Sequence, residues 1–177
     1  MTTALFIGRF QPLHIGHMKD IKDILKECDK VIIAIGSAQY SITPQNPFTH
    51  SQRKEMIRLA LNDAGIPENK YYIVGITDIH NDELWVGHVK SSCPDFDIAY
   101  TGNPLVKKLF ERSGYKVKDI TITKDISSSM IRERILHDLE WKRFVPNAAA
   151  YYLDDIEATA LIKNIEKDIQ SRNPAKK

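Results

Sequence analysis

Short runs of apolar, often β-branched residues alternate along the chain with stretches of helical periodicity. The runs occupy residues 4–7, 31–35, 71–76, 97–101 and 117–122. Three of them are almost continuously apolar, which is typical of strands that are covered on both faces, as in a parallel sheet. The pattern therefore predicts five strands in one parallel sheet.

The segments between these runs predict helices. Over 15–28, apolar residues recur every three or four positions while charged residues face outward, and a second apolar stripe over 56–64 is closed by Gly65. Further helices are predicted at three places: from Asn103 as cap to 114, from about 127, and from Asn147 as cap to about 170.

The alternation of strands and helices predicts an α/β fold, a Rossmann-like three-layer α/β/α sandwich with right-handed crossovers and a helical C-terminal segment. We expect a single domain over residues 1–170 and a flexible tail over 171–177. In open sheets of this kind, ligands bind beyond the carboxyl ends of the strands. Glycine or small polar residues follow each expected strand, at 8–17, 36–39, 78–80, 102–103 and 127–132.

A histidine pair stands where the first loop becomes a helix. His14 and His17 are three residues apart with Gly16 between them, so both imidazoles lie on one side of the helix start. The free backbone amides at such a start favour an anion, and Gly16 lets a phosphate approach the backbone. A metal site, or two surface histidines without a role, are the alternative interpretations of the pair.

A second candidate anion site stands at the helix start around 127–132. Ser127, Ser128 and Ser129 can cap this helix, and Arg132 lies one turn further, where a guanidinium can bind a phosphate with two hydrogen bonds. The alternative is that the serines only cap the helix. The sequence contains neither a Gly-x-x-x-x-Gly-Lys phosphate loop nor a Gly-x-Gly-x-x-Gly fingerprint. Two facing helix starts would suit a nucleoside triphosphate lying across the sheet.

Composition narrows the class of protein. Lys and Arg number 25 and Asp and Glu 23, a net charge of +2, which is too near balance for a protein whose main work is neutralising nucleic-acid phosphates. No apolar run is long enough to span a membrane. Cys28 and Cys93 are too few for a disulfide framework. We expect a cytoplasmic protein without nucleic-acid or membrane partners.

The motifs carry a specific resemblance. The segments GRFQPLHIGH and ISSSMIR resemble the H-x-G-H and [ST]-x-[ST]-x-x-R motifs of the nucleotidylyltransferase superfamily. The words IGSAQYS, NPFT, ELWVGHV and YTGNPLV resemble the archaeal-type nicotinamide mononucleotide (NMN) adenylyltransferases, from about residue 4 to about 150. That family makes NAD and pyrophosphate from ATP and NMN with the help of Mg²⁺, which the phosphates hold rather than protein ligands. The resemblance also implies a homo-oligomer, such as a hexamer.

The resemblance assigns roles to individual residues. His14 and His17 would hold the ATP phosphates and the charge that develops at the reacting α-phosphoryl group, and Arg9 would contact the phosphates nearby. Arg132, with the hydroxyls and amides of Ser127 and Ser129, would bind the β- and γ-phosphates. The remaining residues of the implied ATP site are Gly8, Phe10, Gly16, Gly102 and Asn103.

The implied NMN site lies on the other side of the reacting phosphate. Its residues are Ser37, Gln39, Ile79, Trp85 and Asn103, and Trp85 would stack on the nicotinamide ring, whose positive charge adds a cation–π attraction. A role for Trp85 in the core or at a subunit interface is the alternative. Transfer to another acceptor, such as nicotinate mononucleotide, and a module that senses nucleotides without turnover are the competing functions.

Overall fold

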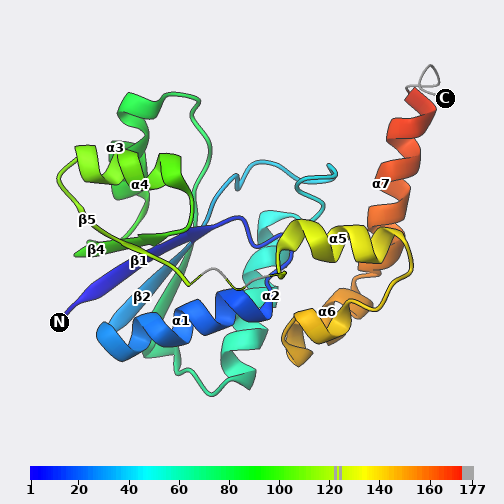
Figure 1. The fold of residues 1–177 in the computed structure, drawn as a ribbon, viewed down its shortest axis with the longest axis horizontal. Helices are drawn as coiled ribbons and strands as arrows, with labels where there is room; N and C mark the ends of the chain where they lie inside the picture. Colours follow the sequence, from blue (N-terminus) through cyan, green and yellow to red (C-terminus); the bar gives the residue numbers. More distant parts are fainter. Residues whose placement is uncertain (122, 124, 173–177) are drawn as a thin grey trace.

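The computed structural model describes residues 1–121, 123 and 125–172, and it contains one five-stranded parallel sheet (Figure 1). The strands are β1 (Thr3–Gly8), β2 (Lys30–Ile35), β3 (Tyr71–Gly75), β4 (Ile98–Thr101) and β5 (Lys116–Asp119), in the order β3-β2-β1-β4-β5. The predicted parallel sheet and Rossmann-like fold are confirmed. The chain turns from one half of the sheet to the other between β1 and β4, where a ligand crevice is expected.

Seven helices lie in the described part of the chain. They are α1 (Ile15–Glu27), α2 (His50–Asp63), α3 (Asp82–Ser92), α4 (Pro104–Arg112), α5 (Ser128–Leu136), α6 (Asn147–Asp155) and α7 (Ala158–Arg172). Short 3₁₀ turns cover Glu68–Lys70 and Lys142–Phe144. In this part of the chain, no helix has the length and apolarity that crossing a membrane requires.

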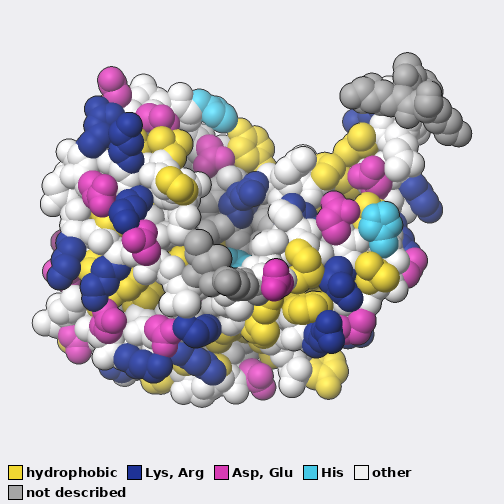
Figure 2. Space-filling view, in the orientation of Figure 1, with side chains coloured by type: hydrophobic (Ala, Val, Ile, Leu, Met, Phe, Trp, Pro, Cys, Tyr) yellow, Lys and Arg dark blue, Asp and Glu magenta, His cyan; other side chains and the backbone are white. Residues whose placement is uncertain are grey.

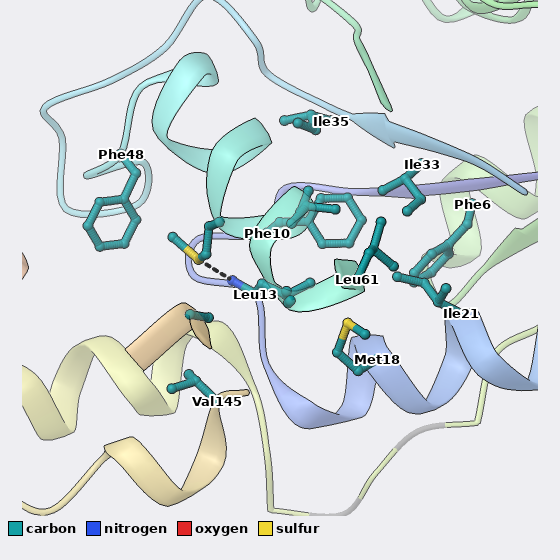
Figure 3. Close-up of a cluster of buried hydrophobic side chains, with 14 of the residues drawn as sticks. Phe6, Phe10, Leu13, Met18, Ile21, Ile33, Ile35, Phe48, Leu61 and Val145 are labelled. Atoms are coloured by element: carbon teal, nitrogen blue, oxygen red, sulfur yellow. Dashed lines mark hydrogen bonds between the residues drawn. The ribbon is translucent and has the colours of Figure 1, made fainter. Parts of the chain in front are cut away.

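The two faces of the sheet are covered by different helices. Phe6 and Ile33 point to the face packed against α1 and α2, whereas Leu5 and Ile32 point to the face covered by α3 and α4. This division follows from the alternation of side chains along a strand. Helices α5, α6 and α7 pack at one end of the α1–α2 layer, where Val145 joins the same core (Figure 3).

Local capping agrees with the sequence at several helix ends. Asn103 accepts hydrogen bonds from the backbone N–H groups of Leu105 and Val106, with Pro104 as the first helical residue of α4. Gly65 follows α2 with φ of +68°, a conformation that favours glycine. These predicted caps are confirmed.

Three expectations about helices are corrected. Helix α3 was not among the predicted helices, because its apolar positions Val86 and Val89 are too few to make a clear stripe. The single long helix expected from Asn147 is two helices, separated at Glu157, whose φ is +52°. Asn147 is the first helical residue rather than the cap, and the cap position belongs to Pro146.

The boundaries at the end of the fifth strand and of the chain also differ from expectation. Strand β5 ends at Asp119, earlier than the expected 117–122, and residue 122 lies outside the described residues. Ser171 and Arg172 belong to α7, whereas 173–177 of the expected tail lie outside the described residues.

Candidate functional site

The loop after β1 is held by two buried polar side chains. Gln11 is 1% exposed, and its side chain accepts from the Phe48 N–H and donates to the Phe48 carbonyl, each at 3.0 Å. Arg53 is completely buried on α2 and donates to the carbonyls of Arg9 (3.1 Å) and Gly36 (2.8 Å). These contacts fix the ends of β1 and β2 relative to the segment that begins α2.

His14 and His17 cap helix α1 reciprocally. The His17 backbone N–H donates to Nδ1 of His14 (3.3 Å), and the His14 backbone N–H donates to Nδ1 of His17 (3.2 Å). The rings stack with centroids 3.5 Å apart. Because both Nδ1 atoms accept hydrogen bonds, the neutral rings carry their proton on Nε2. The capping geometry therefore leaves both Nε2–H groups as donors for a ligand.

Burial keeps the two imidazoles neutral. It lowers the pKa of His14 to about 4, and it lowers the pKa of His17 well below its usual value, with a smaller contribution from the neighbouring His14. The Phe10 ring, itself 1% exposed, packs edge-on against His17 with centroids 4.8 Å apart. At neutral pH the pair offers uncharged donors in a fixed position.

The glycines of this region are required by close contacts. A Cβ on Gly16 would lie 3.0 Å from Nδ1 of His14 and 3.1 Å from the hydroxyl of Thr123. A Cβ on Gly8 would lie 2.9 Å from the Phe10 ring. A side chain at either position would displace a histidine or the ring behind it, so these glycines preserve the site as well as the approach to the backbone.

Helix α5 begins beside the histidine loop. The Ser128 hydroxyl donates to the Pro12 carbonyl (2.9 Å), and the Arg132 guanidinium donates to the Gln11 carbonyl (2.8 Å). Ser127 caps the helix by accepting from the Met130 N–H, and Ser129 accepts from Arg132. The two helix starts are thus joined through the loop that carries His14.

Three arginines gather at this edge of the sheet. Burial, and secondly the charge of Arg9, lower the pKa of Arg53 to about 10 and lower that of Arg132 below its usual value. Arg9 itself is exposed. Mutual repulsion among cations is relieved by a bound anion, so the cluster favours a phosphate-bearing ligand.

A hollow of about 420 Å³ opens between α1, the β4–α4 turn and the segment after β5. Figure 2 shows this face hollowed between the sheet-bearing part and the C-terminal helices. Residues lining it include His14, Gly16, His17, Asp20, Gly102 and Asn103. A larger groove, of about 610 Å³, lies on the opposite side of α1 among exposed lysines, away from the strand ends.

The ends of β2 and β3 form the other half of the site. The Ser37 hydroxyl donates to the Asp78 carboxylate (2.7 Å), and Gln39 exchanges two hydrogen bonds of 3.0 Å with the Asp78 backbone. The Ser37 carbonyl also accepts from the buried Arg53 (3.1 Å). The structure therefore brings Ser37 and Gln39 together on the side of β1 opposite Asn103.

Comparison with known proteins decides the family. Residues 5–134 match the cytidylyltransferase-like family. The nicotinamide-nucleotide adenylyltransferase of Thermococcus sibiricus is 44% identical over 94% of this chain and 91% of its own length. That of Methanolobus tindarius is 43% identical over 94% of this chain and 96% of its own. The chain belongs to this family of nucleotidyltransferases.

A solved structure agrees with the fold. The bifunctional NMN adenylyltransferase/ADP ribose pyrophosphatase of Francisella tularensis superposes with a TM-score of 0.80 at 24% identity, over 93% of this chain. This chain spans about half of the length of that protein, 52%. The archaeal-type resemblance stated from the motifs is confirmed by the curated relatives.

Trp85 and Ile79 are half-buried on the α3 side of the site. The Trp85 ring packs edge-on against Phe110 of α4, with centroids 5.7 Å apart. Through this contact Trp85 packs against the hydrophobic cluster on the sheet face covered by α3 and α4. This agrees with the alternative interpretation of Trp85 as a core residue. Its stacking on a nicotinamide ring stays a prediction.

Several residues at the candidate site are not predicted by the sequence. Arg53 falls in the apolar stripe of α2 with Met56, Ile57 and Ala60, a position that signals burial of a charged residue. Gln11 and Asp20 have no spacing in the sequence that marks them as part of the site. Their partners are distant in sequence, so only the folded chain reveals their contacts.

The described residues give no cluster of three or more His, Cys, Asp or Glu side chains that could hold a metal ion. A metal held mainly by substrate phosphates needs no such cluster. The absence of protein ligands for the metal stays a prediction of the sequence.

Proposed function

We propose that this chain transfers the adenylyl group of ATP to nicotinamide mononucleotide, giving NAD and pyrophosphate. The arrangement that carries the proposal is the joining of two helix starts, through the Arg132–Gln11 and Ser128–Pro12 hydrogen bonds, beside one hollow lined by the histidine pair. Curated relatives that are 40–44% identical over nearly the whole chain bear the name of this activity.

The proposed reaction needs hydrogen-bond donors to the phosphates rather than a general base. The second pKa of a phosphomonoester is near 6, so the attacking mononucleotide phosphate is already ionised at neutral pH. Its oxygen attacks the α-phosphorus of ATP in line with the leaving pyrophosphate. The Nε2–H groups of His14 and His17 would stabilise the charge that develops on the α-phosphoryl oxygens. As neutral imidazoles they would donate hydrogen bonds without transferring a proton to the substrate.

The substrate phosphates would be divided between the two helix starts. Arg132, Ser127 and Ser129 would bind the β- and γ-phosphates, and Arg9 would contact the phosphates near the reacting centre. ATP would enter as its Mg²⁺ complex, with the ion held by phosphates and water and neutralising the departing pyrophosphate. Gly102 and Asn103 would border the nucleoside in the hollow.

The acceptor would lie at the ends of β2 and β3. Ser37 and Gln39 line this side, and Ile79 and Trp85 stand on the segment that follows β3. A nicotinamide cation gains about 0.5–2 kcal/mol from an indole face, an attraction that a zwitterionic nicotinate ring shares in part. Nicotinate mononucleotide therefore remains the second candidate acceptor.

The direct experiment measures pyrophosphate release with ATP, Mg²⁺ and each mononucleotide in turn. We expect release with NMN and weaker or no release with FMN or pantetheine phosphate. Tight ATP binding without release from any acceptor would contradict the proposed enzyme and favour a nucleotide sensor.

Trp85→Ala tests the acceptor site. We expect the KM for NMN to rise by about 2- to 30-fold while the KM for ATP stays nearly unchanged, since a lost cation–π contact of about 0.5–2 kcal/mol is worth that factor. Trp85→Phe is the matched control, because it retains an aromatic ring against Phe110. A change confined to the KM for ATP would contradict the assignment.

The hexamer and the cytoplasmic location expected from the sequence stay predictions. Size-exclusion chromatography with light scattering would measure the number of chains.

A further inference from the structure

A buried carboxylate lines the same hollow as the histidine pair. Asp20 lies on α1 one turn beyond His17, and it is 5% exposed. Burial raises its pKa to about 6, partly opposed by a hydrogen bond from the Thr121 backbone. At pH 7.5 the group is therefore largely an anion that has been taken out of water, which costs free energy unless something compensates.

The position of Asp20 conflicts with phosphate binding. A hollow lined by the two histidine donors is suited to an anion, and a carboxylate beside a phosphate would repel it. Asp20 lies about 4.5 Å further along the α1 axis than His17, at 1.5 Å per residue. Ile120 and Ile126 line the hollow with Thr121, and a smaller cavity that Asp20 also borders includes Lys118 and Asp119.

A carboxylate that shares the hollow with Ile120 and Ile126 suits a flat, uncharged group that carries a hydrogen-bond donor. Adenine presents such a donor in its exocyclic 6-amino group, and its ring faces are apolar. The ribose hydroxyls would have a different partner in the hollow. The Thr123 hydroxyl is buried without a partner in the described chain, and it lies beside Gly16 and His14 at the phosphate end.

We propose that Asp20 accepts a hydrogen bond from the 6-amino group of the adenine ring and so makes the enzyme select ATP over other purine triphosphates. The inference rests on the proposed function insofar as the nucleoside of ATP occupies this hollow. A 6-oxo purine would place a carbonyl oxygen against the carboxylate, and two acceptors without a donor repel each other. Asp20 is thus a specificity-determining residue, separate from the groups that hold phosphate.

The experiment removes the Asp20 carboxylate from the protein and the 6-amino group from the ligand, separately and together. Wild-type enzyme and Asp20→Leu are assayed with ATP and with purine riboside 5′-triphosphate, which lacks the 6-amino group. We expect wild-type kcat/KM to favour ATP by roughly 10–100-fold, the value of one hydrogen bond to a buried charge. In Asp20→Leu the preference should fall to near onefold.

Asp20→Asn gives a second, opposite readout. Its carboxamide can turn an N–H toward a 6-oxo group, so activity with inosine 5′-triphosphate should rise relative to ATP by about tenfold or more. This variant preserves the shape of the side chain, and it keeps the test valid if Asp20→Leu does not fold. Thermal unfolding of each variant shows which proteins are folded.

Asp23→Asn is the matched control. Asp23 is an exposed carboxylate on the same helix, paired with Lys19 and Lys26, and its loss should leave the preference for ATP unchanged. An equal preference for ATP in wild type and Asp20→Leu would overturn the proposal. The proposal would also be overturned if Asp20→Leu lost discrimination between ATP and 2′-deoxy-ATP instead, because that result assigns the carboxylate to the ribose. A higher Mg²⁺ requirement in Asp20→Asn would overturn it as well, because that result assigns the carboxylate to the metal.

The same ligand series can be measured as binding by calorimetry, without an acceptor. If wild-type protein binds ATP in preference to purine riboside triphosphate but releases no pyrophosphate, the proposed function fails while the role of Asp20 stands. If pyrophosphate is released from both triphosphates equally, the role of Asp20 fails while the function stands.

Discussion

The two helix starts of the candidate site offer different chemistry to an anion. At α1, His14 and His17 are locked to each other, and burial holds them neutral. At α5, Ser127 and Ser129 are exposed, and Arg132 supplies a full charge. Both are N-termini with free backbone amides, so the difference lies in the side chains and their burial.

The difference follows from the cost of burying charge. A donor that must lie rigidly beside the reacting phosphorus has to be enclosed, and an enclosed donor is cheapest when it is neutral. In the proposed binding mode the outer phosphates would carry most of the ligand charge and face solvent, where a guanidinium keeps part of its hydration. We therefore expect α1 to control the rate of the chemical step and α5 to control ATP affinity.

The largest expected effect comes from His17→Ala. Removing one donor to a transition-state oxyanion typically costs roughly 10²–10³ in kcat, and we expect that loss with little change in the KM for ATP. Steady-state kinetics with ATP and NMN measures it, and His137→Ala, an exposed histidine at the end of α5, is the control. A loss below threefold would show that α1 does not stabilise the transition state.

A smaller effect is expected at α5. Arg132→Ala should raise the KM for ATP by about 10–100-fold, the value of a charge-assisted hydrogen-bonded contact, and should change kcat less. Arg132→Lys keeps the charge but loses the planar fork, so it should recover only part of the affinity. Because Arg132 also binds the Gln11 carbonyl, unfolding curves must accompany the kinetics. If kcat of Arg132→Ala fell by a larger factor than its KM for ATP rose, the proposed division between rate control at α1 and affinity control at α5 would be wrong.

The smallest effect concerns stability and pH. The folded-state pKa of His14 is about 4 and its unfolded value 6.5, so the unfolded chain binds more protons in this window and stability falls as pH drops from 6.5 toward 4. His14→Asn keeps a capping oxygen but does not titrate. Its melting temperature relative to wild type should therefore rise by a few degrees on acidification through that range. An unchanged difference would mean that His14 is protonated in the native protein.

The pattern of apolar runs was enough to predict the parallel sheet and its layers, since buried strands need continuous apolar residues. Capping residues such as Asn103 and Gly65 were equally readable, because their effect is local. Helix α3 and the break between α6 and α7 at Glu157 could not be predicted from the sequence. A short helix packed through Trp85 and Phe110, and a left-handed residue between two helices, depend on neighbours rather than on periodicity.

The same division holds within the site. The spacing of His14 and His17 and the serine-arginine helix start are properties of contiguous segments, so the amino-acid sequence alone determined that two candidate anion-binding helix starts exist. Tertiary structure alone decided that Arg132 reaches the histidine loop and that Arg53 clamps two strand ends. It also decided that Asp20 is buried in the hollow. These contacts join residues far apart in the chain, and their burial depends on how the layers pack, which no local pattern encodes.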